Sequence, residues 1–363
     1  MEYCERYLAL MGMAPKRIPH EEYLGCPDAE TLITGIDHYG HPRACRLRLQ
    51  EMYPMLNVEI PETDEPKPRP KLENELTGFD EEGRHVAKWS DKVTIHWDFG
   101  KQFKTPDDVF AFSPLENPDF TDSGVVNNWD FGSEEILYER FRARYPAEWG
   151  EAPPEGSAAQ CGFYQTLFMW PLLTFGWELF LECCLDERFE RIMNEFAELN
   201  RRLFRAFARL PVNFVFCHDD IVNSRGPVCS PAWMHKHIFP RYEEFWGMLK
   251  AGGKRVFFVS DGCMDAYADD VFACGAQGIL TEPYTNARAV IRKHPDCFYA
   301  GEGDTRVLSR NNPDEIRAMV ERMVETAQMT GGYFMRIGNE FTWNTPPEAV
   351  KLYLDLCNEL AHR

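Results

Sequence analysis

Residues 212–220, Val-Asn-Phe-Val-Phe-Cys-His-Asp-Asp, place three polar side chains directly after a short apolar run. A run of this length, rich in Val and Phe, is typical of a strand that is buried on both faces. His218, Asp219 and Asp220 follow where that strand ends. Polar groups beside a buried strand need hydrogen-bond partners, so these three residues indicate a helix cap, a turn or a functional site.

Four further apolar segments downstream are followed by polar residues in the same way, and a helical pattern separates each from the next. They are residues 255–259 before Ser260-Asp261-Gly262, 277–280 before Thr281-Glu282-Pro283, 297–300 before Gly301-Glu302-Gly303-Asp304, and 332–337 before Gly338-Asn339. Parallel strands need crossover helices, so this alternation predicts a parallel α/β fold.

A (β/α)8 barrel and a doubly wound nucleotide-binding sheet both fit the alternation. No Gly-x-Gly-x-x-Gly follows a strand, and Gly301-Glu302-Gly303 is only a fragment of that motif. In a barrel, the carboxyl ends of all strands face one mouth. The barrel is therefore favoured, and its predicted catalytic residues are His218, Asp219, Asp220, Asp261, Glu282 and Asn339.

Helix capping is the competing explanation for several of these acids. Asp and Asn are preferred caps and turn residues, which accounts for about half of the positions taken one at a time. Asp304 precedes Thr305 and a helical stretch, so a cap is the favoured interpretation there. His218 with its two neighbouring acids is the hardest group to explain in this way.

The 363 residues are interpreted as one barrel domain, with residues 1–85 as an N-terminal elaboration on it. An extended surface connection is predicted for residues 60–71, Ile-Pro-Glu-Thr-Asp-Glu-Pro-Lys-Pro-Arg-Pro-Lys, because this segment is rich in Pro and charged residues. Two strands are expected after it, near residues 76–80 and 92–97. A single long helix is expected over residues 178–210, before the strand that ends at His218.

Composition excludes several classes of partner and location. A formal net charge of −19 repels phosphate backbones and anionic lipid surfaces, so nucleic acid and membranes are disfavoured. The twelve Cys contain no Cys-x-x-Cys pair, and no apolar run reaches about 18 residues. With no signal-peptide pattern at the start, a cytoplasmic protein with reduced thiols is expected.

The order and spacing of several short motifs resemble the uroporphyrinogen decarboxylase-like superfamily, which includes corrinoid-dependent methyltransferases. The resemblance runs from about residue 176 to the end, and the N-terminal third matches poorly. The motifs on which the resemblance rests are Asp219-Asp220-Ile221, Ser230-Pro231 with Phe239-Pro240, Ser260-Asp261-Gly262, Gly301-Glu302-Gly303-Asp304-Thr305 with Leu308, Gly331-Gly332-Tyr333, and Asn344-Thr345-Pro346.

Two departures narrow what the resemblance implies. Uroporphyrinogen decarboxylases carry an Arg-rich N-terminal motif that grips the carboxylates of the substrate, and no such motif occurs before Pro68. The thiol-methylating branch holds zinc through His-x-Cys-Gly and a later Cys. Here the matching positions are Val259-Ser260-Asp261-Gly262 and Asn339, so thiolate activation by zinc is not expected.

The remaining branch resembles the substrate-side methyltransferases of O-demethylase systems. The resemblance implies transfer of a methyl group from a methoxylated, often aromatic, small molecule to the Co(I) corrinoid of a partner protein. It also implies zinc as the candidate metal, held by His218, Glu182 and Glu198, although Glu198 lies one residue out of the expected register. Glu302 and Asp304 are the residues assigned to cofactor binding.

Two alternatives stay open from the sequence. A decarboxylase or lyase acting on another substrate is supported by the acids at the strand ends and opposed by the missing Arg motif. A barrel that binds a corrinoid or small ligand without catalysis is the other alternative, because the fold alone does not determine function.

Overall fold

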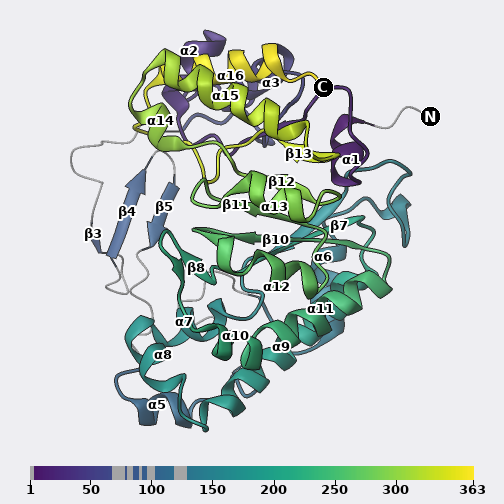
Figure 1. Cartoon of the computed structure of the whole chain (residues 1–363), viewed down its shortest axis with the longest axis vertical. Coiled ribbons are helices and arrows are strands. Elements are labelled where there is room, and N and C mark those ends of the chain that lie inside the picture. Colours follow the sequence, from purple (N-terminus) through teal and green to yellow (C-terminus); the bar gives the residue numbers. More distant parts are fainter. Residues whose placement is uncertain (1–3, 68–77, 80–84, 90–91, 96–102, 118–128) are drawn as a thin grey trace. The chain divides into compact units, whose positions relative to one another are not determined.

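The computed structural model describes residues 4–67, 78–79, 85–89, 92–95, 103–117 and 129–363 (Figure 1). The chain divides into two compact units. The first comprises Met1–Cys4 and Trp97–Ile279, and the second comprises Glu5–His96 and Leu280–Arg363. Within the described residues, no helix has both the length and the apolar character needed to cross a bilayer.

Three neighbouring parallel strands form the sheet of the first unit: β6 (Gln160–Phe163), β7 (Phe214–His218) and β10 (Arg255–Ser260). Phe163 of β6 and Phe258 of β10 both align with Cys217 of β7. The carboxyl ends of the three strands therefore lie level, and residues just beyond them share one edge. The predicted strands at 212–217 and 255–259 are confirmed, each with a boundary shift of one or two residues.

Helices account for most of the rest of the first unit (Figure 1). The long amphipathic helix α9 (Phe189–Arg209) packs against α6 (Glu134–Arg142) and α11 (Phe239–Ala251). The other helical elements are α5 (Pro106–Ala111), η1 (Ala147–Trp149), α7 (Met169–Phe175), α8 (Trp177–Cys183), α10 (Pro231–His237), η2 (Met264–Ala266) and α12 (Ala268–Ala273). A short antiparallel ribbon, β8 (Val222–Asn223) with β9 (Gly226–Pro227), follows β7.

The single helix expected over residues 178–210 is wrong, because the structure has two helices there. Helix α8 ends at Cys183 and α9 begins at Phe189. Between them, Asp186 accepts a hydrogen bond from the backbone N–H of Arg188 at 2.9 Å, which forms a local turn. Asp favours such turns over a continuing helix because its short side chain competes for backbone donors.

The second unit contains five of the short strands. Strands β11 (Gly278–Thr281), β12 (Phe298–Ala300) and β13 (Gly332–Phe334) are neighbours in that order, and the chain passes between the two units within β11. Strand β1 (His20–Glu21) pairs in parallel with β2 (Leu56–Asn57), and His20 also bridges in parallel to Met335, just beyond β13.

The N-terminal segment contributes β1 and β2 at residues 20–21 and 56–57. A separate three-stranded antiparallel sheet consists of β3 (Gly78–Phe79), β4 (His85–Trp89) and β5 (Lys92–Ile95). The strands expected at 76–80 and 92–97 correspond to β3 and β5. Residues 76–77, 80 and 96–97 of those expectations lie outside the described residues.

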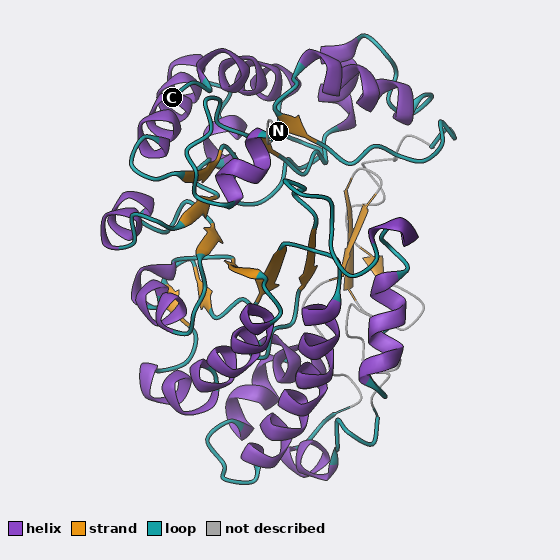
Figure 2. Cartoon of the chain, turned by 90° about the vertical axis from the view of Figure 1, so that its right-hand side faces the viewer, coloured by secondary structure: helices purple, strands orange, loops and turns teal. Residues whose placement is uncertain are grey.

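Figure 2 shows the helices of the molecule as coils beside the short strands. In the second unit, α15 packs against α16, and α16 packs against α2. The helices of this unit are α1 (Glu5–Leu10), α2 (Pro27–Thr34), α3 (Pro42–Met52), α13 (Ala287–Lys293), α14 (Thr305–Ser309), α15 (Pro313–Ala327) and α16 (Pro347–Leu360). The helices expected near 286–293, 313–329 and 346–361 are confirmed.

A glycine after β12 allows two strand ends to approach closely. Gly301 has φ +98°, and a Cβ atom there would lie 1.8 Å from the backbone oxygen of Thr281. Both the left-handed backbone and the space require glycine at this position.

We expect Gly301→Ala to lower the free energy of unfolding by about 2 kcal/mol or more, because the methyl group meets backbone that cannot rotate away. Gly247→Ala on α11 is the matched control, since a Cβ there has no atom within 4 Å. That change should stabilise the chain by about 0.5–1 kcal/mol. Urea unfolding followed by circular dichroism measures both, and equal midpoints for the two variants would contradict this account.

Candidate functional site

Polar side chains from three strand ends meet at the edge of the first unit's sheet. Asp220, two residues beyond β7, accepts hydrogen bonds from the Tyr164 hydroxyl at 3.0 Å and the Asp261 backbone N–H at 2.9 Å. The same carboxylate lies 3.0 Å from Nε2 of His218. The ring of Tyr164 lies against that of His218, with centroids 4.2 Å apart. We call Tyr164, His218, Asp220 and Asp261 the rim cluster.

The rim cluster remains open to solvent in part. The His218 and Asp220 side chains are 20% and 15% exposed. Burial would lower the pKa of His218, but the charge of Asp220 and the hydrogen bond to it raise the pKa above its ordinary value. Burial would likewise raise the pKa of Asp220, yet His218 and the hydrogen bonds to the carboxylate lower it. Each member of the pair therefore favours the charged form of the other.

Glycine after β10 sets the position of Asp261. Gly262 has φ +92°, and a Cβ there would lie 2.6 Å from the backbone carbon of Asn223 on β8. The Cys263 N–H donates to the Asn223 oxygen at 2.9 Å, which closes this turn. The turn brings a ligand atom of Asp261 within 4.8 Å of those of His218 and Asp220.

Asp219 has a different role from the other predicted acids. Its side chain is fully buried and accepts backbone hydrogen bonds from three consecutive residues, Leu167, Phe168 and Met169, at 2.6–2.7 Å. The Tyr242 hydroxyl donates a fourth at 2.6 Å. Burial raises the pKa of Asp219 to about 7, against the lowering effect of these bonds. Asp219 is therefore a positioning residue that holds the start of α7, rather than a group exposed at the rim.

The predicted residues of the second unit form smaller arrangements. The Asn339 amide donates to Glu282 at 3.2 Å, so these two predicted catalytic residues lie side by side. Asp304 accepts from the Arg306 N–H at 2.8 Å and caps α14, which agrees with the cap expected there.

Glu302, assigned to cofactor binding from the sequence, is 7% exposed and already has three donors. They are Arg322 at 3.1 Å, Thr326 at 3.2 Å and Tyr333 at 2.9 Å. Because these donors come from α15 and β13, they attach the β12 end to the neighbouring elements. The Glu302 carboxylate therefore helps to hold these elements together.

The zinc ligands implied by the resemblance do not come together. In the described part of the chain, two groups of three side chains have ligand atoms close enough for a metal ion, and neither contains Glu182 or Glu198. Glu182 is exposed on α8, and Glu198 on α9 pairs with Arg201 at 3.1 Å. Glu182 and Glu198 lie on different helices and 16 residues apart, and even one continuous helix would separate them by about 24 Å. His218 instead groups with Asp220 and Asp261.

Two tyrosines of this region were not predicted from the sequence. Tyr164 follows β6, whose four residues, Gln-Cys-Gly-Phe, lack the apolar run that identified the other strands. Tyr242 lies inside α11, where a helical Tyr is usually a core residue. The one signal available was position, because Tyr164 follows a strand and precedes the buried stretch 165–176.

The C-terminal half of the chain matches a known protein family. The model of the uroporphyrinogen decarboxylase (URO-D) family matches residues 178–360, which is half of the chain. The chain belongs to the uroporphyrinogen decarboxylase family. The match begins in α8 and ends in α16, so it includes β7, β10 and three of the rim cluster's four residues. No curated protein sequence matches the chain.

A solved structure shares this fold over nearly its whole length. A methyltransferase from Methanosarcina mazei superposes with a TM-score of 0.57 over 99% of both chains, at 14% identity. The family match and this superposition confirm the predicted barrel class. Weaker similarity extends to a D-psicose 3-epimerase, which covers 69% of this chain and 93% of its own with a TM-score of 0.36 and 11% identity. A xylose isomerase-like TIM barrel protein from Mycobacterium smegmatis covers 63% and 90%, with a TM-score of 0.28 and 10% identity.

We expect Asp219→Ala to lower the free energy of unfolding by about 3–4 kcal/mol, because it leaves four buried donors without an acceptor. Asp304→Ala removes a partly exposed cap and should cost only about 1 kcal/mol. Denaturant unfolding of both variants checks the difference. Similar losses in the two variants would show that the buried carboxylate does not hold α7.

The titration of His218 should depend on Asp220. Because its pKa is raised in the folded chain, the ion pair stabilises the fold fully below the ordinary value of 6.5, and this contribution is lost as pH rises through the raised pKa. In Asp220→Asn, only burial and the weaker remaining charges act on the imidazole, so the pKa should fall. NMR titration of the ring protons measures this, with His218→Gln identifying the resonance. An unchanged titration curve would contradict the pairing.

Proposed function

We propose that this protein is a methyltransferase that moves a methyl group from a methoxylated, aromatic small molecule to the Co(I) corrinoid of a partner protein. The observation that carries the proposal is the rim cluster, in which an imidazole and two carboxylates have ligand atoms within 4.8 Å of one another. The His218 and Asp220 side chains stay partly open to solvent. The fold shared with the M. mazei methyltransferase supports the reaction class.

The rim cluster suits the demand of this reaction on the protein. The partner's corrinoid supplies the nucleophile as Co(I). As the methyl carbon bonds to cobalt, its bond to oxygen breaks and the electron pair of that bond stays on the oxygen. His218 then donates its proton to this oxygen, and Asp220 holds the imidazole in the orientation for donation. The charge of Asp220 raises the pKa of His218, which favours the protonated imidazole that this step needs.

A divalent cation is the other way to stabilise the departing oxygen. One imidazole and two carboxylates are a donor set that Zn²⁺ and similar ions accept, so His218, Asp220 and Asp261 would hold it. The ion would act there as a Lewis acid. The Tyr164 hydroxyl, which donates to Asp220, would stay behind the ligands and orient that carboxylate.

A decarboxylase acting on another substrate is the second candidate, favoured by the family to which the chain belongs. The formal net charge of −19 argues against a substrate with many carboxylates, because the chain would repel it at a distance. Release of carbon dioxide without any corrinoid would identify this alternative. Binding of a corrinoid protein without turnover would instead indicate the non-catalytic barrel.

The test is methyl transfer from a panel of methoxylated aromatic compounds to a reduced corrinoid protein, with a strong one-electron reductant that keeps cobalt as Co(I). We expect transfer by the wild-type chain and a loss of at least about 100-fold in kcat/KM for His218→Ala, the range typical of a lost acid catalyst. Asp261→Ala should also lower kcat/KM, because it removes one of the carboxylates of the rim cluster. The change in the cobalt absorption spectrum measures the rate.

His235→Ala is the matched control, since His235 is a 56% exposed imidazole on α10 outside the rim cluster. It should retain the wild-type rate, and circular dichroism should show that all three variants are folded. No transfer by the wild-type chain to an active partner protein, across the whole panel, would contradict the proposal.

A further inference from the structure

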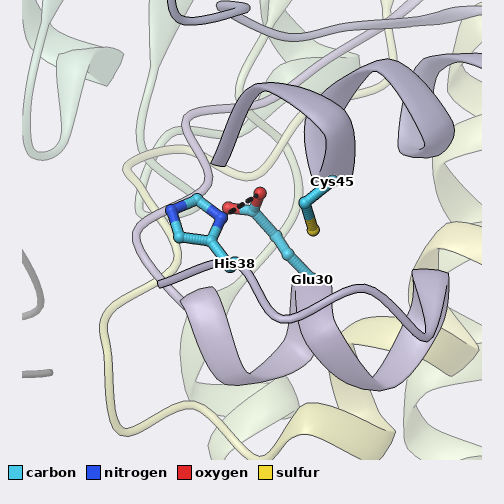
Figure 3. A group of neighbouring side chains, drawn as sticks. All are labelled: Glu30, His38 and Cys45. Atoms are coloured by element: carbon cyan, nitrogen blue, oxygen red, sulfur yellow. Dashed lines mark hydrogen bonds and ion pairs between the residues drawn. The ribbon is translucent and has the colours of Figure 1, made fainter. Parts of the chain in front are cut away.

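A second group of metal-ligand side chains is buried in the second unit, among elements that the proposed reaction does not use. Glu30 lies on α2, Cys45 lies on α3, and His38 lies in the loop between these helices (Figure 3). Their exposed fractions are 1%, 0% and 4%. One ligand atom of each lies within 4.8 Å of those of the other two. We call these three residues the hairpin cluster.

The contacts of the hairpin cluster aim all three groups at one another. Nδ1 of His38 is 2.9 Å from Oε2 of Glu30, and Figure 3 shows the Cys45 sulfur on the far side of the same carboxylate. The loop that carries His38 is held by its own backbone, because the His38 N–H donates to the Thr31 hydroxyl at 3.0 Å. Two helices and their connection thus bring three ligand atoms within 4.8 Å of one another.

Arg46 forms an ion pair with the Glu30 carboxylate. Its guanidinium donates to both oxygens of Glu30 at 3.1 Å, and also to backbone oxygens of Leu24 and Glu59. Each carboxylate oxygen has a second lone pair, so Glu30 can accept from Arg46 and still face His38 and Cys45. An arginine behind a ligating carboxylate orients it, as outer partners of metal ligands commonly do.

The donor types select the ion. A thiolate, an imidazole and a carboxylate together favour a borderline ion such as Zn²⁺ over Mg²⁺ or Ca²⁺, which prefer oxygen ligands alone. In a tetrahedral zinc site the ligand atoms stand roughly 3.3–3.6 Å apart, given metal–ligand bonds of about 2.0–2.3 Å. The 2.9 Å contact between His38 and Glu30 needs to open by only a few tenths of an ångström to reach this spacing.

We propose that Glu30, His38 and Cys45 form a zinc site that ties α2 to α3 in the N-terminal part of the chain. The site is separate from the rim cluster, and its role is to stabilise the helical hairpin rather than to take part in the reaction. The chain supplies three ligands, and a solvent molecule completes a tetrahedral shell.

Cobalt substitution tests this proposal, because a Co²⁺–thiolate bond gives an intense near-ultraviolet charge-transfer band that oxygen and nitrogen ligands do not. The full chain, stripped of metal with a chelator, is titrated with Co²⁺ and then with Zn²⁺. We expect the band to appear in the wild-type chain and to vanish as Zn²⁺ displaces Co²⁺. Zn²⁺ should also raise the melting temperature.

Variants at the ligands, with matched controls, show which residues bind the metal ion and give rise to the band. Cys45→Ser keeps the hydrogen bond to Thr34 but should lose the band, whereas Cys297→Ser, at another buried cysteine, should keep it. His38→Gln should weaken Zn²⁺ binding by at least about 100-fold, more than the roughly 10–100-fold typical of a residue behind the ligands. Asp261→Ala should keep the band, because the rim cluster contains no thiol.

A band that survives Cys45→Ser, or one that disappears with Asp261→Ala, would overturn the assignment. A wild-type chain that gives no band and binds Zn²⁺ no more tightly than His38→Gln would overturn the site itself. Each of these outcomes leaves the methyl-transfer assay unaffected, so failure here is distinguishable from failure of the proposed function.

Discussion

The buried carboxylate of Asp219 is the interaction on which the rim cluster depends. It accepts from three consecutive backbone N–H groups at the start of α7 and from the Tyr242 hydroxyl on α11. Those bonds hold the segment after β6 against the end of β7, and the Thr166 N–H also donates to the His218 oxygen at 3.0 Å. Tyr164 begins this segment, so its position beside His218 follows from the same anchor.

Asp219 and Asp220 are adjacent in the sequence but have different roles in the structure. Asp219 and Asp220 follow the same strand, and successive side chains of an extended chain point in opposite directions. One carboxylate therefore enters the interior and serves the fold, while the other reaches the rim and pairs with His218. The environment, rather than the residue type, determines which acid can take part in chemistry.

The site was predictable where it depended on strand ends and not where it depended on side-chain direction. The apolar runs before His218 and Asp261 place these residues at neighbouring strand ends, and in the structure they are adjacent. Asp219, Glu302 and Asp304 follow strands too, yet each has donors that hold the fold. Tyr164 was missed because β6 is short and contains a glycine.

The sequence alone determined that parallel strands alternate with helices after residue 212, because apolar runs and helix starts depend on neighbouring residues only. It also determined the barrel class, through the polar residues that follow each strand. Only the tertiary structure decided that two-residue segments near His20 and Leu56 are parallel strands, since pairing with distant chain defines them. It alone brought Glu30, His38 and Cys45 together, because the approach of two helices sets those distances and local sequence does not.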